Sequence, residues 1–175
     1  MISIGDFINN QPLHAVAMLG EKPSLFDRLI DENTDINRQD NDGCTALMYA
    51  AAYNINPLII DRLIEHNADL NIRDHKGRTA LMHAVLYNDN PAVMNRLILA
   101  GALVNLQDMY GYTALMHACL SSRQPIPIER LIDAGSNVHL KNNDNETAFD
   151  LIQQNRAVKT SEIFWRLSAM NTFSK

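Results

Sequence analysis

The chain has 175 residues, of which 46% are hydrophobic, and a formal net charge of −5 at pH 7. This length and apolar content predict one domain with a substantial core. The negative charge argues against a nucleic-acid partner, which usually requires a basic surface.

The N-terminal residues indicate neither a secretion signal nor a membrane anchor. Residues 1–10 contain no basic side chain and no long apolar run, and no later stretch reaches the ~18 apolar residues of a membrane helix. Cys44 and Cys119 are too few for a disulfide framework, which is typical of a reducing compartment. We therefore expect a cytoplasmic protein without a membrane partner, in which residues 1–10 cap the N-terminal end.

One sequence pattern, Asp-x-x-Gly-x-Thr-Ala-Leu-Met-x-Ala, occurs three times, at residues 40–50, 74–84 and 108–118. A degraded copy follows at residues 143–149. The threonines of these copies are spaced by 34 residues without drift, at Thr45, Thr79, Thr113 and Thr147. A fixed period in this range predicts stacked structural repeats. We place these repeats at about 11–44, 45–78, 79–112 and 113–146, with a capping repeat at 147–175, all in one domain.

Each repeat is predicted to contain two helices. The threonine is a good N-cap for the first helix, and Leu47, Ala50 and Ala51 then form one apolar stripe. Prolines on the same period are predicted at the first position of the second helix: Pro23, Pro57, Pro91 and Pro125. That helix is predicted to end at residues that tolerate a left-handed conformation: Asn33, Asn67, Gly101 and Gly135.

A helix pair and a turn with this signature resemble the ankyrin repeat over residues 11 to about 155. The resemblance implies an all-α solenoid of stacked helix-turn-helix units joined by extended turns. Methionine stands where that family has a histidine after its leucine, at Met48, Met82 and Met116, and we expect it to pack there instead. The last repeat has Asn145 in place of the turn glycine.

The C-terminal segment is predicted to form a capping helix out of register with the preceding repeats. This helix lies around residues 161–170, and Ile163, Trp165 and Leu167 are expected to cover the last repeat.

The residue types that could support catalysis or metal binding do not form a recognisable motif. His83 and His117 occupy one column, but equivalent residues in adjacent repeats are separated by about 8–10 Å, too far to share a metal ion. Cys44 and Cys119 lack a surrounding nucleophile motif. We therefore expect no enzyme activity, no metal and no cofactor.

A second column contains arginines: Arg28, Arg62, Arg96 and Arg130. These lie opposite the apolar face of the second helix. A stripe of arginines could bind phosphate or an acidic partner, but a solvated surface produced by repeat duplication is the favoured interpretation.

The positions that vary between repeats lie on the first helix, away from its apolar stripe, and at the tips of the turns. Several carry large aromatic or cationic side chains, which mark interaction sites when they gather on a surface. The resemblance implies that the same positions form the concave binding face of an ankyrin solenoid. The predicted partner-binding residues are Tyr49, Tyr53, Arg73, His75, Lys76, Arg78, His83, Tyr87, Met109, Tyr110, Tyr112 and His117.

The resulting functional hypothesis is non-catalytic recognition of a protein partner, as a scaffold, adaptor or inhibitor. The partner is expected to offer an acidic group near Arg78 and an apolar group near Tyr110, and the free chain is expected to be a monomer. Two alternatives stay open, namely a self-associating structural protein and a neutralising immunity protein for a toxin enzyme.

Overall fold

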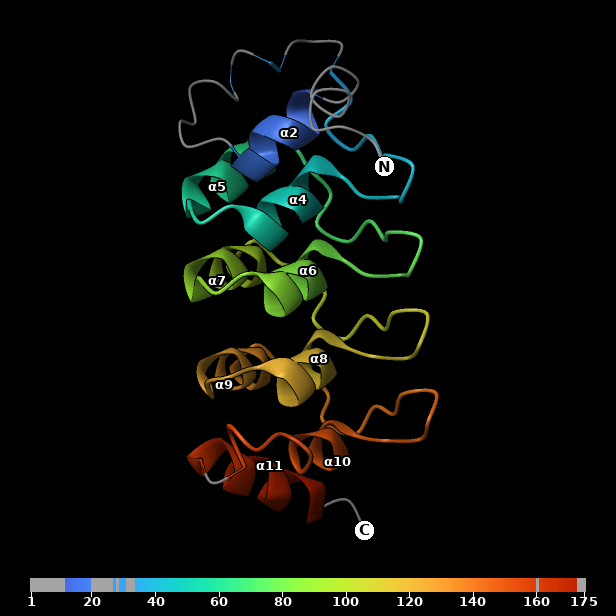
Figure 1. Cartoon of the computed structure of the whole chain (residues 1–175), viewed down its shortest axis with the longest axis vertical. Helices are drawn as coiled ribbons and strands as arrows, with labels where there is room; N and C mark the ends of the chain where they lie inside the picture. The colour runs from blue at the N-terminus through green and yellow to red at the C-terminus, as the bar shows by residue number, and fades with distance from the viewer. Residues whose placement is uncertain (1–11, 20–26, 28, 31–33, 160, 173–175) are drawn as a thin grey trace. The chain divides into compact units, whose positions relative to one another are not determined.

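The computed structural model describes residues 12–19, 27, 29–30, 34–159 and 161–172. Within these ranges the chain forms helices and turns, and no strand (Figure 1). The helices are α2 (Pro12–Leu19), α4 (Ala46–Tyr53), α5 (Pro57–Glu65), α6 (Ala80–Tyr87), α7 (Pro91–Leu99), α8 (Ala114–Ser121), α9 (Ile126–Asp133), α10 (Ala148–Ile152) and α11 (Glu162–Thr172). The predicted all-α class is confirmed. The predicted cap at residues 1–10 and the roles of Pro23, Arg28 and Asn33 lie outside the described residues.

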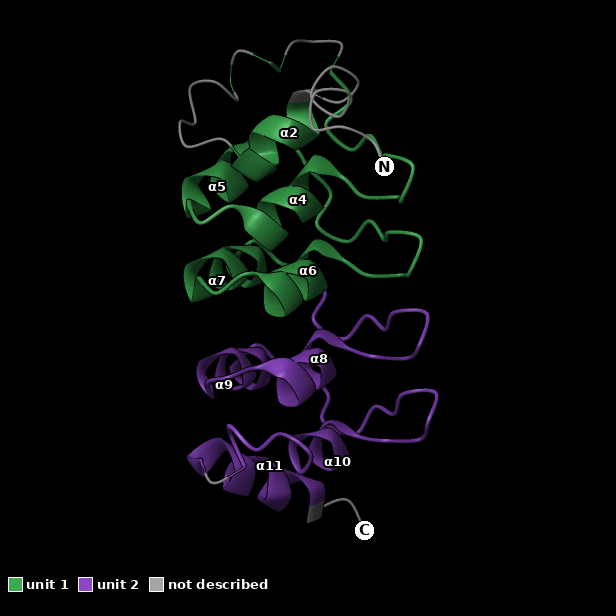
Figure 2. Cartoon of the chain, in the orientation of Figure 1, with its two compact units in different colours: residues 1–102 green, residues 103–175 purple. Residues whose placement is uncertain are grey.

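The chain divides into two compact units, residues 1–102 and residues 103–175 (Figure 2). In the first unit, α4 packs between α2 and α6, while α5 packs against both α4 and α7. In the second unit, α8 packs against α9 and α10, and α10 packs against α11. In the first unit the first helices of successive repeats therefore pack against one another in a row.

Threonine caps begin the helices α4, α6, α8 and α10, as predicted. The hydroxyls of Thr45, Thr79 and Thr113 accept hydrogen bonds from backbone N–H groups three residues later, at N···O distances of 3.4, 3.5 and 3.2 Å. Each bond satisfies one of the amides that the first turn of a helix leaves unpaired. Thr147 adds a reciprocal capping box, because the Asp150 carboxylate accepts from the Thr147 backbone N–H.

The second helix begins at proline in two repeats and one residue later in a third. Asn56 precedes Pro57 and accepts from Leu58 N–H at 3.1 Å, and Asn90 does the same for Ala92 at 3.0 Å before Pro91. The helix α9 instead starts at Ile126, with Pro125 as a cap residue that makes no side-chain bond. The prediction for Pro125 is therefore wrong by one position, and Gln124 stands where the capping asparagine would be.

The second helices end as predicted, at residues with positive φ. Asn67, Gly101 and Gly135 have φ of 62°, 94° and 85°. The turn brings Ala68 N–H within 2.9 Å of the Leu63 carbonyl, so a carbonyl of the last helical turn is satisfied.

The core is built from the repeated leucine and methionine. Leu81 and Leu115 are 1% and 0% exposed, and Met48, Met82 and Met116 are each 1% exposed. The prediction that methionine packs where the family pattern has histidine is confirmed. Surrounding alanines keep the helices close, because small side chains let the backbones approach.

Buried or half-buried asparagines link consecutive repeats by hydrogen bonds, a feature that the sequence analysis did not predict. The Asn54 amide donates to the Ala17 carbonyl at 2.9 Å, and the Asn88 amide donates to the Ala51 and Asn54 carbonyls. In the second unit Asn155 makes the equivalent bonds, to the carbonyls of residues 119 and 122. Each amide satisfies carbonyl groups at the end of the preceding first helix.

The C-terminal helix packs on α10 through Ile163 and Leu167, which are 2% and 0% exposed. Trp165, predicted to be part of this cap, is 66% exposed. Residues 163 and 167 share one helix face because they are four apart, whereas a residue two positions away points to the other side. The Trp165 ring meets Phe164 edge-on, at 5.3 Å between ring centres.

No helix in the described ranges is both long enough and apolar enough to cross a membrane.

Candidate functional site

A pocket of about 280 Å³ lies in the first unit, between two successive turns and the helices α4 and α6. Its walls are formed by Asp42, Cys44, Met48, Tyr49, Tyr53, Asp74, His75, Lys76, Arg78, His83 and Tyr87. Seven of the predicted partner-binding residues are in this set, so the structure brings them together around one opening. Arg73 is an exposed residue outside the lining and donates to the Gly77 carbonyl.

Asp74 organises the turn beside this pocket. One carboxylate oxygen, Oδ1, accepts from the backbone N–H groups of Lys76 and Arg78, both at 2.8 Å. The other, Oδ2, contacts Arg78 Nη2 at 2.7 Å and His83 Nε2 at 3.0 Å. Burial alone would raise the pKa of Asp74, but the hydrogen bonds from His83 and Arg78 hold that pKa well below its usual range.

His83 was predicted to face outward, and this prediction is wrong. Its side chain is buried because the turn carrying Asp74 folds over it. Arg78 also differs from the prediction of a cation free to meet a partner. Its guanidinium binds Asp74 and donates to the Tyr87 hydroxyl at 2.7 Å, and the Arg78 side chain is only 16% exposed. Lys76 of the same turn is an exposed cation that lines the pocket.

Tyrosines form the outer wall of the pocket. Tyr53 and Tyr87 are 51% and 46% exposed, and their rings stack at 6.1 Å between centres with 23° between planes. Tyr49 continues the row behind Tyr53 at 6.4 Å, and its hydroxyl donates to Asp40 at 2.7 Å. The two outer rings therefore present an aromatic surface to solvent, while Tyr49 is half-buried.

Cys44 adds a thiol to the inner wall. Cys44, Asp74 and His83 each offer one atom that could bind a metal ion, and these three atoms all lie within 4.8 Å of one another. Burial, followed by the negative charges of Asp40 and Asp74, raises the pKa of the Cys44 thiol to about 12. The thiol is thus protonated near neutral pH, unlike the low-pKa thiolates of cysteine nucleophiles. The sequence analysis treated the cysteines and histidines separately and missed this cluster.

The remaining predicted binding residues lie in the second unit and form a related turn. Asp108 Oδ1 accepts from the backbone N–H groups of Tyr110 and Tyr112, both at 2.9 Å, and Oδ2 contacts His117 Nε2 at 2.9 Å. Tyr112 stacks on His117 at 5.1 Å and is half-buried with it, so both are less outward-facing than predicted. Met109 and Tyr110 are 56% and 55% exposed at the tip of the turn.

Comparison with protein families identifies the repeats. A family model described as ankyrin repeats, in three copies, matches residues 13–108, and a single ankyrin repeat model matches residues 110–143. The first match alone covers more than half of the chain. The chain belongs to the ankyrin repeat family. A search of curated proteins finds no match.

Ankyrin repeats are generally modules for protein–protein interaction, and the family is typically non-catalytic. The predicted family resemblance is therefore confirmed. In this ankyrin chain the pocket lies on turn tips and first helices, the positions that the sequence analysis singled out for partner binding.

The described members of the arginine column, Arg62, Arg96 and Arg130, are surface charges on the second helices of the ankyrin repeats. Arg62 contacts Glu65 at 2.8 Å and Asp27 at 3.8 Å, and Arg96 contacts Asp61 at 3.3 Å. These two arginine side chains are 43% and 48% exposed, so solvent screens their ion pairs. These contacts support the interpretation of a solvated surface.

Proposed function

We propose that this ankyrin-repeat protein is a non-catalytic recognition module, an adaptor or an inhibitor, that binds a protein partner at the pocket of the first unit. The observation that carries this proposal is the exposed, stacked pair Tyr53 and Tyr87 at the rim of that pocket. Tyrosine is among the residues that most often dominate the energy of a protein interface.

The tyrosine pair is also pre-organised for binding. Tyr87 is held by its hydrogen bond from Arg78, and Tyr53 is held against Tyr87 on one side and Tyr49 on the other. A side chain fixed before association loses little rotamer freedom when the complex forms. An apolar or aromatic group of the partner is expected to cover these rings.

The charge arrangement suggests where the partner's acidic group sits. Arg78 is neutralised locally by Asp74, whereas the side chains of Lys76, His75 and Arg73 are exposed at the same turn. We therefore place the acidic group of the partner at Lys76 rather than at Arg78. In the second unit, Met109 and Tyr110 offer a further exposed apolar surface at the tip of the turn.

The test uses matched surface variants of the full chain. Wild type, Tyr53→Ala/Tyr87→Ala and the control Arg62→Ala/Arg96→Ala are immobilised and incubated with native cell lysate, and captured proteins are quantified by mass spectrometry. The partner is the protein that the tyrosine variant loses and the arginine variant retains. Essential arginines and dispensable tyrosines would reject the proposed site.

Calorimetry with the purified partner then gives the magnitudes. Tyr53→Ala/Tyr87→Ala is expected to reduce the binding free energy by about 2 kcal/mol or more, as hot-spot truncations do. Tyr110→Ala/Tyr112→Ala tests the second unit in the same way, with the same expected loss if its turn also contacts the partner. Lys76→Glu should slow association and reduce its salt dependence, because it removes a steering charge.

Light scattering on the free chain tests the expectation of a monomer, and an activity assay of the captured partner distinguishes an inhibitor from an adaptor.

A further inference from the structure

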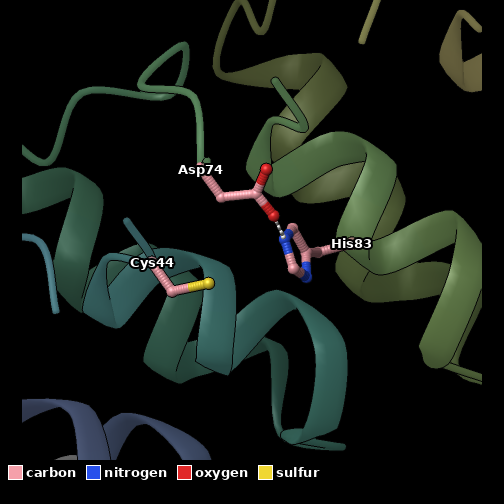
Figure 3. Close-up of side chains that lie close together, drawn as sticks. All are labelled: Cys44, Asp74 and His83. Atoms are coloured by element: carbon pink, nitrogen blue, oxygen red, sulfur yellow. Dashed lines mark hydrogen bonds and ion pairs between the residues drawn. The ribbon is translucent and has the colours of Figure 1, made fainter. Parts of the chain in front are cut away.

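We propose that Cys44, Asp74 and His83 form a binding site for one divalent ion of the Zn²⁺ class, at the inner wall of the pocket in the first unit. Figure 3 shows the three side chains converging from separate segments: Cys44 just before α4, Asp74 in the following turn, and His83 on α6. All three residues are buried.

The donor set selects the metal. A thiolate sulfur, an imidazole nitrogen and a carboxylate oxygen are the ligand types that Zn²⁺ takes in proteins. The Cys44 thiol releases its proton to solvent when the ion binds, as metal-ligating cysteines do. Mg²⁺ and Ca²⁺ prefer oxygen ligands alone, so a site with sulfur and nitrogen disfavours them. Three protein ligands beside an open pocket also leave a fourth coordination position accessible from outside.

The ion-free geometry is close to what a tetrahedral ion requires. Zinc–ligand bonds of about 2.0–2.3 Å place neighbouring ligand atoms about 3.3–3.8 Å apart. His83 Nε2 and Asp74 Oδ2 are 3.0 Å apart, and the gathered atoms of the cluster all lie within 4.8 Å of one another. The separations therefore differ from those of a tetrahedral site by about 1 Å. The backbone N–H groups of residues 76 and 78 already orient the Asp74 carboxylate, as outer-shell contacts do at metal sites.

Arg78 is the competitor of the ion. Its guanidinium nitrogens Nε and Nη2 both contact Asp74 Oδ2, at 2.8 and 2.7 Å, the oxygen that also faces His83. A cation bound there must share or displace the arginine, which keeps its bond to the Tyr87 hydroxyl. Arg78 thus sets the affinity of the site, and its removal is expected to strengthen metal binding.

The chain contains an internal control. Asp108 and His117 repeat the carboxylate–imidazole contact at 2.9 Å, in the second unit. Among the described residues, however, only the set around Cys44 gathers three such donors. The second cysteine, Cys119, is buried on α8 outside the cluster.

The experiment is a titration of untagged full-length protein with Co²⁺, followed by displacement with Zn²⁺. We expect one ion per chain and a near-ultraviolet absorption band from sulfur-to-cobalt charge transfer, which disappears when Zn²⁺ replaces Co²⁺. Cys44→Ser should abolish the band and weaken Zn²⁺ binding at least tenfold, and His83→Gln should also weaken it. Cys119→Ser and His117→Gln should bind as wild type does.

Arg78→Gln should bind Zn²⁺ several times more tightly than wild type. Added Zn²⁺ should also raise the Tm of Arg78→Gln by more than it raises the Tm of wild type. The proposal is overturned if wild type shows no charge-transfer band, or if the band survives Cys44→Ser. Weaker binding by Arg78→Gln would overturn the assignment of Arg78 as the competitor.

Discussion

The Asp74 turn of the first unit and the Asp108 turn of the second share one frame but present different surfaces. In each, one carboxylate oxygen accepts from two backbone N–H groups of the turn, and the other faces a histidine, at 3.0 and 2.9 Å. The difference lies in the residue four positions after the aspartate. Arg78 pairs with its carboxylate, whereas Tyr112 stacks on its histidine.

This difference separates the residues that both turns share from the residue that varies between them. The aspartate and histidine close the turn onto the first helix in both units, so they are fixed by folding. The residue at position 78 or 112 is free of that requirement and decides whether the turn carries an ion pair or an aromatic stack. The following predictions test this separation, beginning with the largest effect.

The core frame is expected to be equally important in both units. Leu81→Ala and Leu115→Ala should each destabilise by about 2–5 kcal/mol, because each empties a fully buried position. Denaturant unfolding monitored by circular dichroism measures the loss. An unchanged midpoint in either variant would show that its leucine does not belong to the core.

Asp74 and Asp108, in contrast, are expected to contribute different amounts to the free energy of unfolding. Asp74→Asn should destabilise by about 2–3 kcal/mol, because it leaves the mostly buried Arg78 without its charge partner. Asp108→Asn lacks that consequence and should lose only about 1 kcal/mol, the value of ordinary hydrogen bonds. Equal losses in the same unfolding assay would mean that the Arg78 pair adds nothing to stability.

The pH dependence of stability should carry the signature of Asp74. Its pKa is lowered in the folded chain, so its contribution to stability is complete above the unfolded value of about 3.9 and is lost as the pH falls below that value. The free energy of unfolding of wild type, measured from pH 7 to pH 2.5, should therefore fall more steeply below pH 4 than that of Asp74→Asn. Parallel curves for the two proteins would contradict the lowered pKa.

The smallest effects are expected at the helix caps. Thr79→Ala and Thr113→Ala should each lose about 1 kcal/mol, the usual value of an N-cap hydroxyl. The loss should be larger at Thr113, whose bond to Met116 N–H is 3.2 Å long against 3.5 Å for the bond from Met82 to Thr79. Thermal unfolding of the two variants in parallel compares them.

The features that the sequence predicted correctly are those governed by local chemistry. Threonine caps, left-handed helix ends and the buried leucine stripe depend on neighbouring residues, so the 34-residue period is enough to place them. His83 was placed wrongly because a helical period describes one helix, whereas the burial of His83 comes from a turn that folds back onto it. Trp165 was placed wrongly because its apolar character was given more weight than its helical position.

The candidate site was predicted only in part, for the same reason. Variation between repeats identified tyrosines and a cationic turn, and the pocket of the first unit is lined by three of those tyrosines and by His75, Lys76 and Arg78 of that turn. The pairing of Arg78 with Asp74 and the approach of Cys44 to His83 depend on side-chain directions across successive repeats. A repeat period gives no information about those directions.

The residue with positive φ in each turn, such as Gly43, Gly111 or Asn145, has a consequence for protein engineering. A side chain at Gly43 would meet the backbone nitrogen of His75 at 2.8 Å, and one at Gly111 would meet that of Asn143 at the same distance, because the next turn lies directly against each glycine. Asn145 occupies the same place at φ 64° with an exposed side chain that accepts from Lys141. A designer who wishes to lengthen the array by grafting another repeat after residue 146 should therefore first replace Asn145 with glycine. Without that change, the side chain of Asn145 would clash with the backbone of the added turn.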